Sequence, residues 1–369
     1  MRIAIATPSP RAKRETFIDA HIRLLPGVAL VLEGGSVPET DGAGRPLLGS
    51  SRADAIRFAV RKRFGGKDRR AQLRDRIAEL VRAERIDVLL CEYGTTATEL
   101  LPCAREAGVP LVAHFHGFDA TQQDAIARYG GYASLWREAA GIVAVSVAQR
   151  ERLVSLGAPG HKLFLNPYGV DDSAAIGDPG ASPPIMLAVG RFTEKKAPLL
   201  LLAAFKRVAE ARPAARLVVA GDGDQFASAV HFVKAEGLEG RVELPGRLDH
   251  AAVLARMAQA RAFVQHSVTA LNGDVEGMPV AILEAMMAGL PVVSTRHMGI
   301  AESVVERETG LLGDEHDVEA MARHMIRLID DPALAARMGA AGHARAMANY
   351  RMSDSIGRLA AILQRCAKH

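Results

Sequence analysis

The stretch DVEGMPVAILEAMMAGLPVVST, residues 274–295, contains the repeating unit of the predicted fold. A loop-like EGMP leads into a helix that we place at 279–288, since proline is favoured in the first turn of a helix. The run PVVSTR at 291–296 is apolar and β-branched, as in a buried strand. The stretch therefore predicts a helix followed directly by a strand.

The same alternation extends through the second half of the chain. The expected strands are IMLAVG (185–190), RLVVAGDG (216–223), RVELPG (241–246) and RAFVQHS (261–267). The expected helices cover 198–211, 224–237, 249–260 and 317–330. Repeated β-α-β alternation predicts a parallel sheet covered by helices.

A similar block precedes the linker DDSAAIGDPGASPP (171–184), which is small, polar and rich in Pro and Gly. Its expected strands are 2–7, 28–34, 86–93, 110–117, 141–146 and 162–169, with helices in 52–85 and 146–156. We therefore predict an α/β protein of two Rossmann-like β/α/β domains facing a central cleft, with ligands at the carboxyl ends of the strands. The domains are placed at 1–172 and 185–345, with the linker at 173–184 and a helix in 346–369 that could pack on either domain.

Length and composition limit the class of protein. A chain of 369 residues favours two domains, and its 49% hydrophobic and 24% charged residues are typical of globular proteins. The three cysteines lie far apart, which excludes a disulfide scaffold and a zinc ribbon and suits a reducing compartment. The longest apolar run, 199–205, is too short to span a bilayer, and the amino terminus is typical of a strand rather than of a signal peptide. We expect a cytoplasmic protein, soluble or peripheral on the inner face of the cytoplasmic membrane.

The net charge of +4 is unevenly distributed. Residues 52–85 contain 12 Arg or Lys and 5 Asp or Glu, a local charge of +7. Such a segment is either a solvated helical face or a surface that meets anionic membrane lipids. We expect no nucleic acid partner, because no aromatic-interleaved or helix-turn-helix pattern accompanies the charge.

An anion site is predicted where EGMP meets the helix, because N–H groups there point outward and the helix dipole adds positive potential. These N–H groups belong to Gly277, Met278, Val280 and Ala281. Glu276 stands just before the helix and would face the bound group, whereas Glu284 lies further along the helix. Two glutamates at this spacing also occur on ordinary amphipathic helices, so the surrounding residues decide.

These surrounding residues resemble the retaining family 4 glycosyltransferases, which carry the pattern D-x-E-G-x-P-x-x-x-x-E-A-x-A-x-G-x-P-V-V-S-T. The matching positions are Asp274, Glu276, Gly277, Pro279, Glu284, Ala285, Gly289, Pro291, Val292, Val293, Ser294 and Thr295. The family's glycine–isoleucine turn and following glutamate are matched by HMGIAE (297–302). The resemblance implies a GT-B fold in which Glu276 contacts the donor sugar and Glu284 binds the ribose hydroxyls of the nucleotide. It places the acceptor in the amino-terminal domain and the nucleotide sugar in the carboxyl-terminal domain.

The segment VGRFTEKKA (189–197) supplies positive charge after a buried strand. Two fixed cations, Arg191 and Lys196, suit a diphosphate leaving group that gains charge as the glycosidic bond breaks. By the resemblance these two residues bind the donor diphosphate, and Lys195 is the alternative lysine.

The segment HFHGFDA (114–120) follows another expected strand. A histidine at a strand end is a candidate ligand for sugar hydroxyls, although a lone histidine is more often structural. The segment resembles the family's His-Gly-x-Asp element, whose histidine contacts the donor sugar. His116 matches that histidine and Asp119 the aspartate, and His114 is a weaker candidate.

Further similarity covers nearly the whole chain. RETFIDAHIRLL (14–25) and CEYGTTA (91–97) resemble the exopolysaccharide and colanic-acid-type subgroup, and 146–171 resembles the end of the family's first domain. AGDGDQ (220–225) and LPGRLDH (244–250) fall where the family lines the nucleobase pocket, which makes Gly246, Arg247 and Leu248 candidates. The loop TPSPRAKRE replaces a Gly-Gly phosphate loop, and whether Arg11, Lys13 or Arg14 takes over its role is open.

We expect no metal and no other cofactor. Asp222 and Asp224 have the Asp-x-Asp form of a cation site, but the cationic side chains already match the diphosphate. The prediction is a retaining, metal-independent hexosyltransferase that uses a nucleotide sugar, UDP favoured over GDP, and a glycan or lipid-linked glycan acceptor in surface or exopolysaccharide biosynthesis. The alternatives are an inactive sugar-nucleotide-binding scaffold of the same fold and a synthase acting on a soluble glucan.

Overall fold

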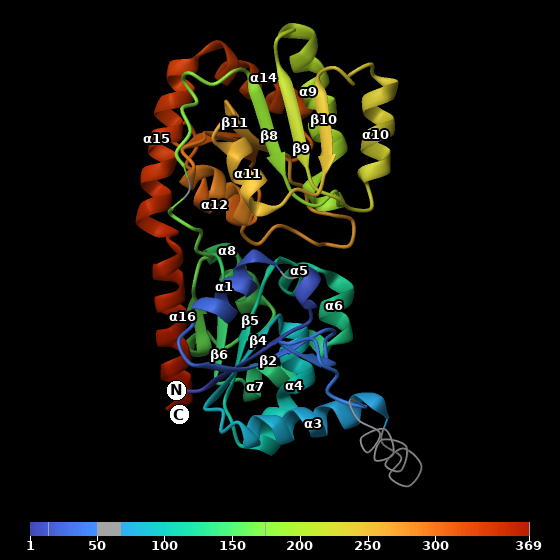
Figure 1. The fold of residues 1–369 in the computed structure, drawn as a ribbon, viewed down its shortest axis with the longest axis vertical. Helices are drawn as coiled ribbons and strands as arrows, with labels where there is room; N and C mark the ends of the chain where they lie inside the picture. The colour runs from blue at the N-terminus through green and yellow to red at the C-terminus, as the bar shows by residue number, and fades with distance from the viewer. Residues whose placement is uncertain (14, 50–67, 174, 369) are drawn as a thin grey trace. The chain divides into compact units, whose positions relative to one another are not determined.

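The computed structural model describes residues 1–13, 15–49, 68–173 and 175–368, which form two compact units (Figure 1). Unit 1 contains Met1–Pro167 and Ser355–His369, and unit 2 contains Tyr168–Asp354. The chain therefore leaves unit 1 after Pro167, a few residues before the expected linker, and returns to it near its carboxyl end.

Unit 1 is built on a seven-stranded sheet in the order β3-β2-β1-β4-β5-β6-β7. The strands are β1 (Ile3–Thr7), β2 (Val28–Glu33), β3 (Thr40–Asp41), β4 (Val88–Glu92), β5 (Leu111–His114), β6 (Gly141–Ala144) and β7 (Leu163–Leu165). Every neighbouring pair is parallel except β2 with β3, a short antiparallel edge strand that the sequence did not predict. All residues of β1, β4, β5 and β6 are buried, as expected for strands covered on both faces.

The helices of unit 1 are α1 (Thr16–Leu24), α3 (Arg69–Ala83), α4 (Gly94–Ala107), α5 (Gly117–Thr121), α6 (Gln123–Arg128), α7 (Ala133–Glu138), α8 (Val147–Ser155) and the returning α16 (Met352–Ala367). Ile356, Leu359 and Leu363 are buried on one face of α16. Ser355 Oγ donates to the Pro167 carbonyl at 2.8 Å, and Arg358 Nε donates to Asn166 Oδ1 at 3.1 Å. The carboxyl-terminal helix thus packs on unit 1.

Unit 2 contains a six-stranded parallel sheet in the order β10-β9-β8-β11-β12-β13. The strands are β8 (Ile185–Val189), β9 (Arg216–Ala220), β10 (Val242–Gly246), β11 (Ala262–Gln265), β12 (Val292–Thr295) and β13 (Gly310–Gly313). The helices are α9 (Pro198–Ala211), α10 (Phe226–Ala235), α11 (His250–Met257), α12 (Val280–Met287), α13 (Met298–Ser303), α14 (Val318–Asp330) and α15 (Pro332–Asn349). The five strands predicted here are confirmed, and β13 is an additional one.

The basic segment is described only from residue 68 onward, so the rest of 52–85 lies outside the described residues. In 68–85 there are 6 Arg and 4 Asp or Glu, a charge of +2. Along α3, Arg69 pairs with Glu39 at 2.9 Å, Arg82 pairs with Glu106 at 3.1 Å, and Arg74 pairs with Glu99. The arginines of α3 thus form a salt-bridged surface. Among the described helices, none combines the length and the apolar composition that a membrane span requires.

Candidate functional site

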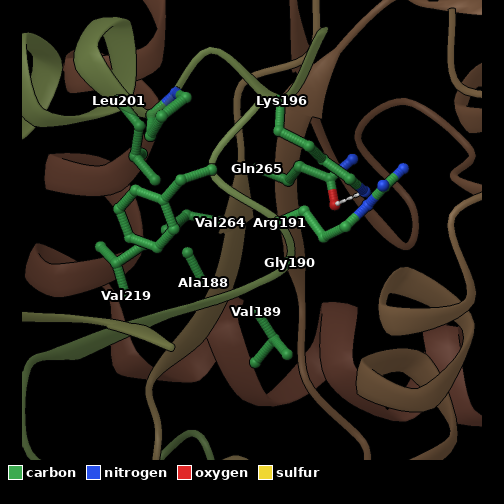
Figure 2. A pocket seen from close by; sticks show the side chains of 11 residues that line it. Ala188, Val189, Gly190, Arg191, Lys196, Leu201, Val219, Val264 and Gln265 are labelled. Carbon is green, nitrogen blue, oxygen red and sulfur yellow. Dashed lines mark hydrogen bonds between the residues drawn. The ribbon is translucent and has the colours of Figure 1, made fainter. Parts of the chain in front are cut away.

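The cationic part of the predicted site lies directly after β8 in unit 2. A single turn, Glu194–Lys196, ends in Ala197 with a φ of 39°, and α9 starts at Pro198. This turn points Lys196 back toward the strand ends, where its Nζ donates to Gln265 Oε1 at 3.1 Å (Figure 2). Arg191 is exposed and lies alongside Lys196, and both line a cavity with Gly190 and Gln265. Arg191 and Lys196 are therefore brought together as the sequence predicts.

Glu276 is buried against the same lysine. Its Oε2 lies 3.1 Å from Lys196 Nζ, and its Oε1 lies 3.6 Å from Lys195 Nζ. Burial acts to raise the pKa of Glu276, but the charges of Lys196 and Lys195 outweigh it and lower this pKa to about 2. Glu276 is consequently ionised throughout the physiological pH range.

Lys195 differs from Lys196 in its partners. Its Nζ lies 3.0 Å from Asp274 Oδ1 and donates to the Val275 carbonyl at 3.3 Å. These bonds hold the start of the EGMP loop, whereas Lys196 reaches the cavity. The geometry favours Lys196 over Lys195 as the lysine available to a ligand.

A histidine that the sequence analysis did not select fixes the backbone of Glu276. The Glu276 N–H donates to His297 Nε2 at 3.0 Å, so this nitrogen carries no proton. His297 Nδ1 then donates to Glu315 Oε1, and Glu315 also accepts from the Thr269 N–H at 2.7 Å. Burial raises the pKa of Glu315, but the bonds from His297 and Thr269 outweigh it and lower this pKa. The sequence contains one sign of this series of hydrogen bonds from Glu315 through His297 to Glu276: the histidine that begins HMGIAE.

The EGMP loop leads directly into α12, as the sequence predicts. Gly277, Met278 and Pro279 are buried, and Pro279 is the N-cap of α12, one position before the expected first turn. A Cβ on Gly299 would lie 1.8 Å from the Gly277 carbonyl oxygen, so only glycine allows this close approach of α13 to the loop. Val280, the first residue of α12, is half-buried.

Glu284 lies on α12 beside the segment predicted to line the nucleobase pocket. Its Oε1 is 3.8 Å from Nδ1 of His250, the first residue of α11. Burial raises the pKa of Glu284 to about 7. Of the neighbouring candidates, Gly246 ends β10 with a φ of 74°, Arg247 is exposed and Leu248 is half-buried.

The loops after β8, β9 and β10 are in direct backbone contact. A Cβ on Gly221, where φ is 146°, would lie 1.9 Å from the Gly190 carbonyl oxygen. The Gly221 N–H donates to the Gly246 carbonyl at 2.8 Å. Asp222 and Asp224 are exposed at this edge of the sheet.

In unit 1, Asp119 joins two loops. Its Oδ1 accepts from the His116 N–H at 2.8 Å, and its Oδ2 accepts from the Gly94 N–H at 2.6 Å. Burial raises the pKa of Asp119 to about 7. Because both oxygens are occupied by backbone groups, the structure gives Asp119 the role of positioning His116.

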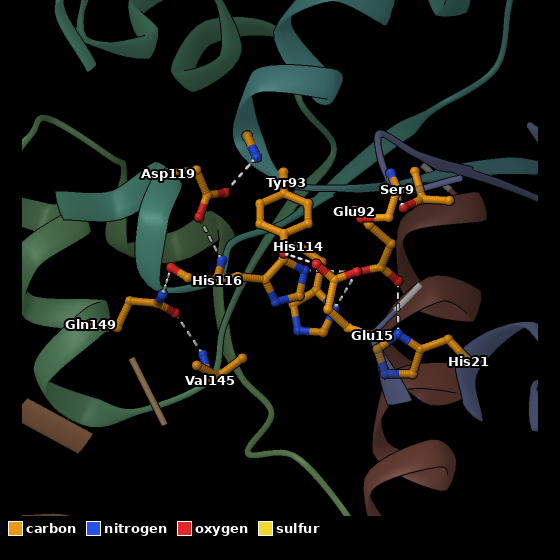
Figure 3. A network of polar contacts seen from close by, with 12 residues as sticks. Ser9, Glu15, His21, Glu92, Tyr93, His114, His116, Asp119, Val145 and Gln149 are labelled. Carbon is orange, nitrogen blue, oxygen red and sulfur yellow. Dashed lines mark hydrogen bonds and ion pairs between the residues drawn. The ribbon is translucent and has the colours of Figure 1, made fainter. Parts of the chain in front are cut away.

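His116 is the N-cap of α5 and is held on several sides (Figure 3). Its Nε2 lies 2.9 Å from Glu92 Oε2, and its carbonyl accepts from Gln149 Nε2. The rings of Tyr93 and Phe17 pack against it, with centroids 4.5 and 4.7 Å away. Burial lowers the pKa of His116 to about 4, so the imidazole is neutral at pH 7.

The sequence analysis did not select Glu92 or His21 as site residues, although both lie in segments that resemble the family. Glu92 ends β4 and contacts three imidazoles, those of His21, His114 and His116. Burial acts to raise the pKa of Glu92, but the neighbouring histidines outweigh it and keep this pKa well below its usual range. In the loop after β1, Arg11 is exposed at the start of a short turn, and Arg14 lies outside the described residues.

Comparison with known proteins agrees with this architecture. Residues 172–345 match the family described as Glycosyl transferases group 1, and residues 35–174 match Glycosyltransferase Family 4. The colanic acid biosynthesis glycosyltransferase named WcaL, from Escherichia coli (strain K12), is 31% identical over 293 residues, which cover 77% of this chain and 71% of WcaL. A GDP-mannose-dependent phosphatidylinositol monomannoside mannosyltransferase of Mycolicibacterium smegmatis is 28% identical over 298 residues, which cover 75% of this chain and 76% of that protein.

The crystal structure of Anabaena HepE in complex with UDP and glucose superposes with a TM-score of 0.78 at 19% identity, covering 99% of both chains. The fold is that of the GT-B glycosyltransferases. The chain belongs to glycosyltransferase family 4.

Proposed function

We propose that this protein transfers a hexose from a nucleotide sugar, with retention of anomeric configuration, to a glycan or lipid-linked glycan in surface or exopolysaccharide biosynthesis. The observation that carries the proposal is the group of Arg191, Lys196 and Glu276 at the carboxyl ends of β8 and β11. The similarity to WcaL, whose name refers to colanic acid, supports this type of product.

Arg191 and Lys196 bind the donor diphosphate, Glu276 the sugar and Glu284 the ribose. Fixed cations stabilise the negative charge that develops on the leaving diphosphate, so no metal ion is required to bridge it. The acceptor attacks from the face that the diphosphate leaves, without a covalent intermediate on the protein. The departing diphosphate accepts the proton of the acceptor hydroxyl.

Proton NMR of the product tests this mechanism through its anomeric coupling. We expect the configuration of the donor to be kept, and a rate that is the same without added Mg²⁺ or Mn²⁺. An inverted anomer contradicts retention, and a rate that depends on added Mg²⁺ or Mn²⁺ contradicts only the metal-free diphosphate contact.

A UDP-sugar is the favoured donor, supported by the similarity to HepE, which binds UDP and glucose. The GDP-mannose-dependent relative makes a GDP-sugar the specific alternative. A thermal-shift screen of both classes separates them, because the true donor stabilises the folded protein by mass action. Binding without turnover of any acceptor would favour an inactive scaffold, and turnover on soluble glucan would favour a synthase.

We further propose a cytoplasmic location, with the basic segment 52–85 on an anionic membrane surface. Each basic residue near such a surface contributes about 1 kcal/mol. The ion pairs of α3 reduce the attraction that residues 68–85 can contribute, and the rest of the segment lies outside the described residues. Sedimentation with anionic and with neutral liposomes tests it, and equal, negligible binding to both leaves a solvated face.

A further inference from the structure

A buried carboxylate in unit 1 is surrounded by imidazoles. Glu92 ends β4 with no exposed surface, and its Oε1 lies 2.7 Å from His21 Nδ1. Its Oε2 lies 3.2 Å from His114 Nδ1 and 2.9 Å from His116 Nε2. Figure 3 shows the carboxylate between His21 on one side and the rings of His114 and His116 on the other.

The ion-pairing partners of Glu92 within the described residues are all imidazoles, which carry no permanent charge. The side chains of His21, His114 and His116 are at most 4% exposed. Removing a carboxylate from water is costly unless a cation compensates its charge. In unit 2 the equivalent compensation of Glu276 comes from two lysines, whereas the described partners of Glu92 can supply it only as protonated imidazoles or as ligands that share a metal ion with it.

We propose that His21 Nδ1, His114 Nδ1 and the Glu92 carboxylate bind a transition-metal ion of the zinc type. Nitrogen and oxygen donors from two histidines and one glutamate form a ligand set that Zn²⁺ prefers, whereas Mg²⁺ and Ca²⁺ prefer oxygen alone. One ring nitrogen of each histidine and one carboxylate oxygen of Glu92 lie within 4.8 Å of one another. Donors on one zinc ion lie at most about 4.2 Å apart, since each bond is about 2.1 Å long, so small side-chain rotations complete the site.

The ion would join three elements at the carboxyl edge of the sheet: α1 through His21, β4 through Glu92 and β5 through His114. Each neutral imidazole binds the metal through the nitrogen that faces Glu92 and keeps its proton on the other ring nitrogen. His116 keeps its bond to Glu92 Oε2, so the ion orients His116 through the carboxylate. Its role is structural, and it is separate from the metal-free diphosphate contact of unit 2.

The test uses the full chain after treatment with a chelator, titrated with Co²⁺ and then with Zn²⁺. We expect one Co²⁺ per chain with a visible d–d absorption, displacement by Zn²⁺, and a higher Tm in Zn²⁺ by mass action. Absence of stoichiometric binding by the wild-type protein overturns the proposal.

Variants locate the ion. His21→Gln and His114→Gln each weaken Co²⁺ binding about 100-fold or more, since even outer partners of a metal contribute 10–100-fold. His161→Gln changes an exposed histidine of the same unit and binds as the wild type does. His21 is buried on a helix and His114 on a central strand, so a substitution at either position can prevent folding. Thermal melts show which variants fold, and Glu92→Gln is a third variant of the site. Wild-type Co²⁺ affinity in any folded variant of the three ligands places the ion elsewhere and overturns the site.

Discussion

The carboxylates Glu276 and Glu92 are both buried at the carboxyl ends of parallel strands, yet their surroundings differ. Glu276 is compensated by the ammonium groups of Lys195 and Lys196, and Arg191 lines the cavity beside Lys196. Among the described residues, the ion-pairing partners of Glu92 are imidazoles, whose charge depends on a proton. The difference teaches that unit 2 is suited to binding a highly charged anion, whereas unit 1 is suited to holding a neutral imidazole in a fixed position.

The largest effect is expected when a positive charge is removed from the unit 2 site. Lys196→Ala and Arg191→Ala each lower kcat/KM about 10²–10³-fold, the effect of losing one stabiliser of transition-state charge. Steady-state kinetics with the donor found by thermal shift measure this. Lys206→Ala, which removes a surface lysine paired with Glu236, is the matched control and keeps the wild-type rate. Wild-type turnover in the folded Lys196 and Arg191 variants would remove the diphosphate assignment.

The next effect concerns Glu284. Glu284→Ala weakens binding of the free nucleoside diphosphate by about 1.5–3 kcal/mol, because a charge-assisted bond to the ribose hydroxyls is lost. Calorimetry measures the change in Kd. An unchanged Kd contradicts the ribose role.

The pH dependence sharpens this test. Burial raises the pKa of Glu284 to about 7, so the carboxyl is largely protonated at pH 6 and ionised at pH 8. Ribose hydroxyls donate to the ionised form, so affinity for the nucleotide sugar falls as the pH falls, by about tenfold between pH 8 and pH 6. Glu284→Gln, which does not titrate, should lose this dependence. The nucleotide sugar is the ligand of choice because its diphosphate has no proton to release in this range.

The smallest effect tests the chain from Glu315 through His297. His297→Ala leaves the buried N–H of Glu276 without its acceptor, at a cost of about 1–3 kcal/mol. We expect kcat to fall about tenfold while the Kd for free UDP is unchanged, since UDP lacks the sugar that Glu276 contacts. His316→Asn is the control: it changes an exposed neighbour whose φ of 66° asparagine tolerates. An unchanged kcat in a folded His297 variant would leave His297 a purely structural residue.

The sequence predicted most of the architecture because buried parallel strands appear as continuous apolar runs, as in IMLAV of β8 and VLLCE of β4. The sequence did not predict β3, because this strand has only two residues, Thr40 and Asp41, and lacks an apolar pattern. The sequence did not predict β13, because the two glycines of GLLG are typical of a turn. The expected strand at 216–223 ends at Ala220, since Gly221 turns the chain against Gly190.

The candidate site was predictable where cations follow a strand, as Arg191 and Lys196 do. The residues that position them were not. Whether Gln265 reaches Lys196, or His297 reaches the N–H of Glu276, depends on how distant segments pack. For Asp119 the sequence indicated contact with a ligand. In the structure its carboxylate oxygens accept hydrogen bonds from the backbone N–H groups of His116 and Gly94.

The return of α16 to unit 1 has a consequence for biosynthesis. The chain completes unit 2 at Asp354, but Leu359, Leu363 and Cys366 belong to the buried interior of unit 1. Domains generally fold as units while the ribosome delivers the chain from its amino terminus. Here the amino-terminal unit lacks one of its helices until residues 355–368 have been synthesised, so it cannot be completed before all residues of the second unit are in the chain.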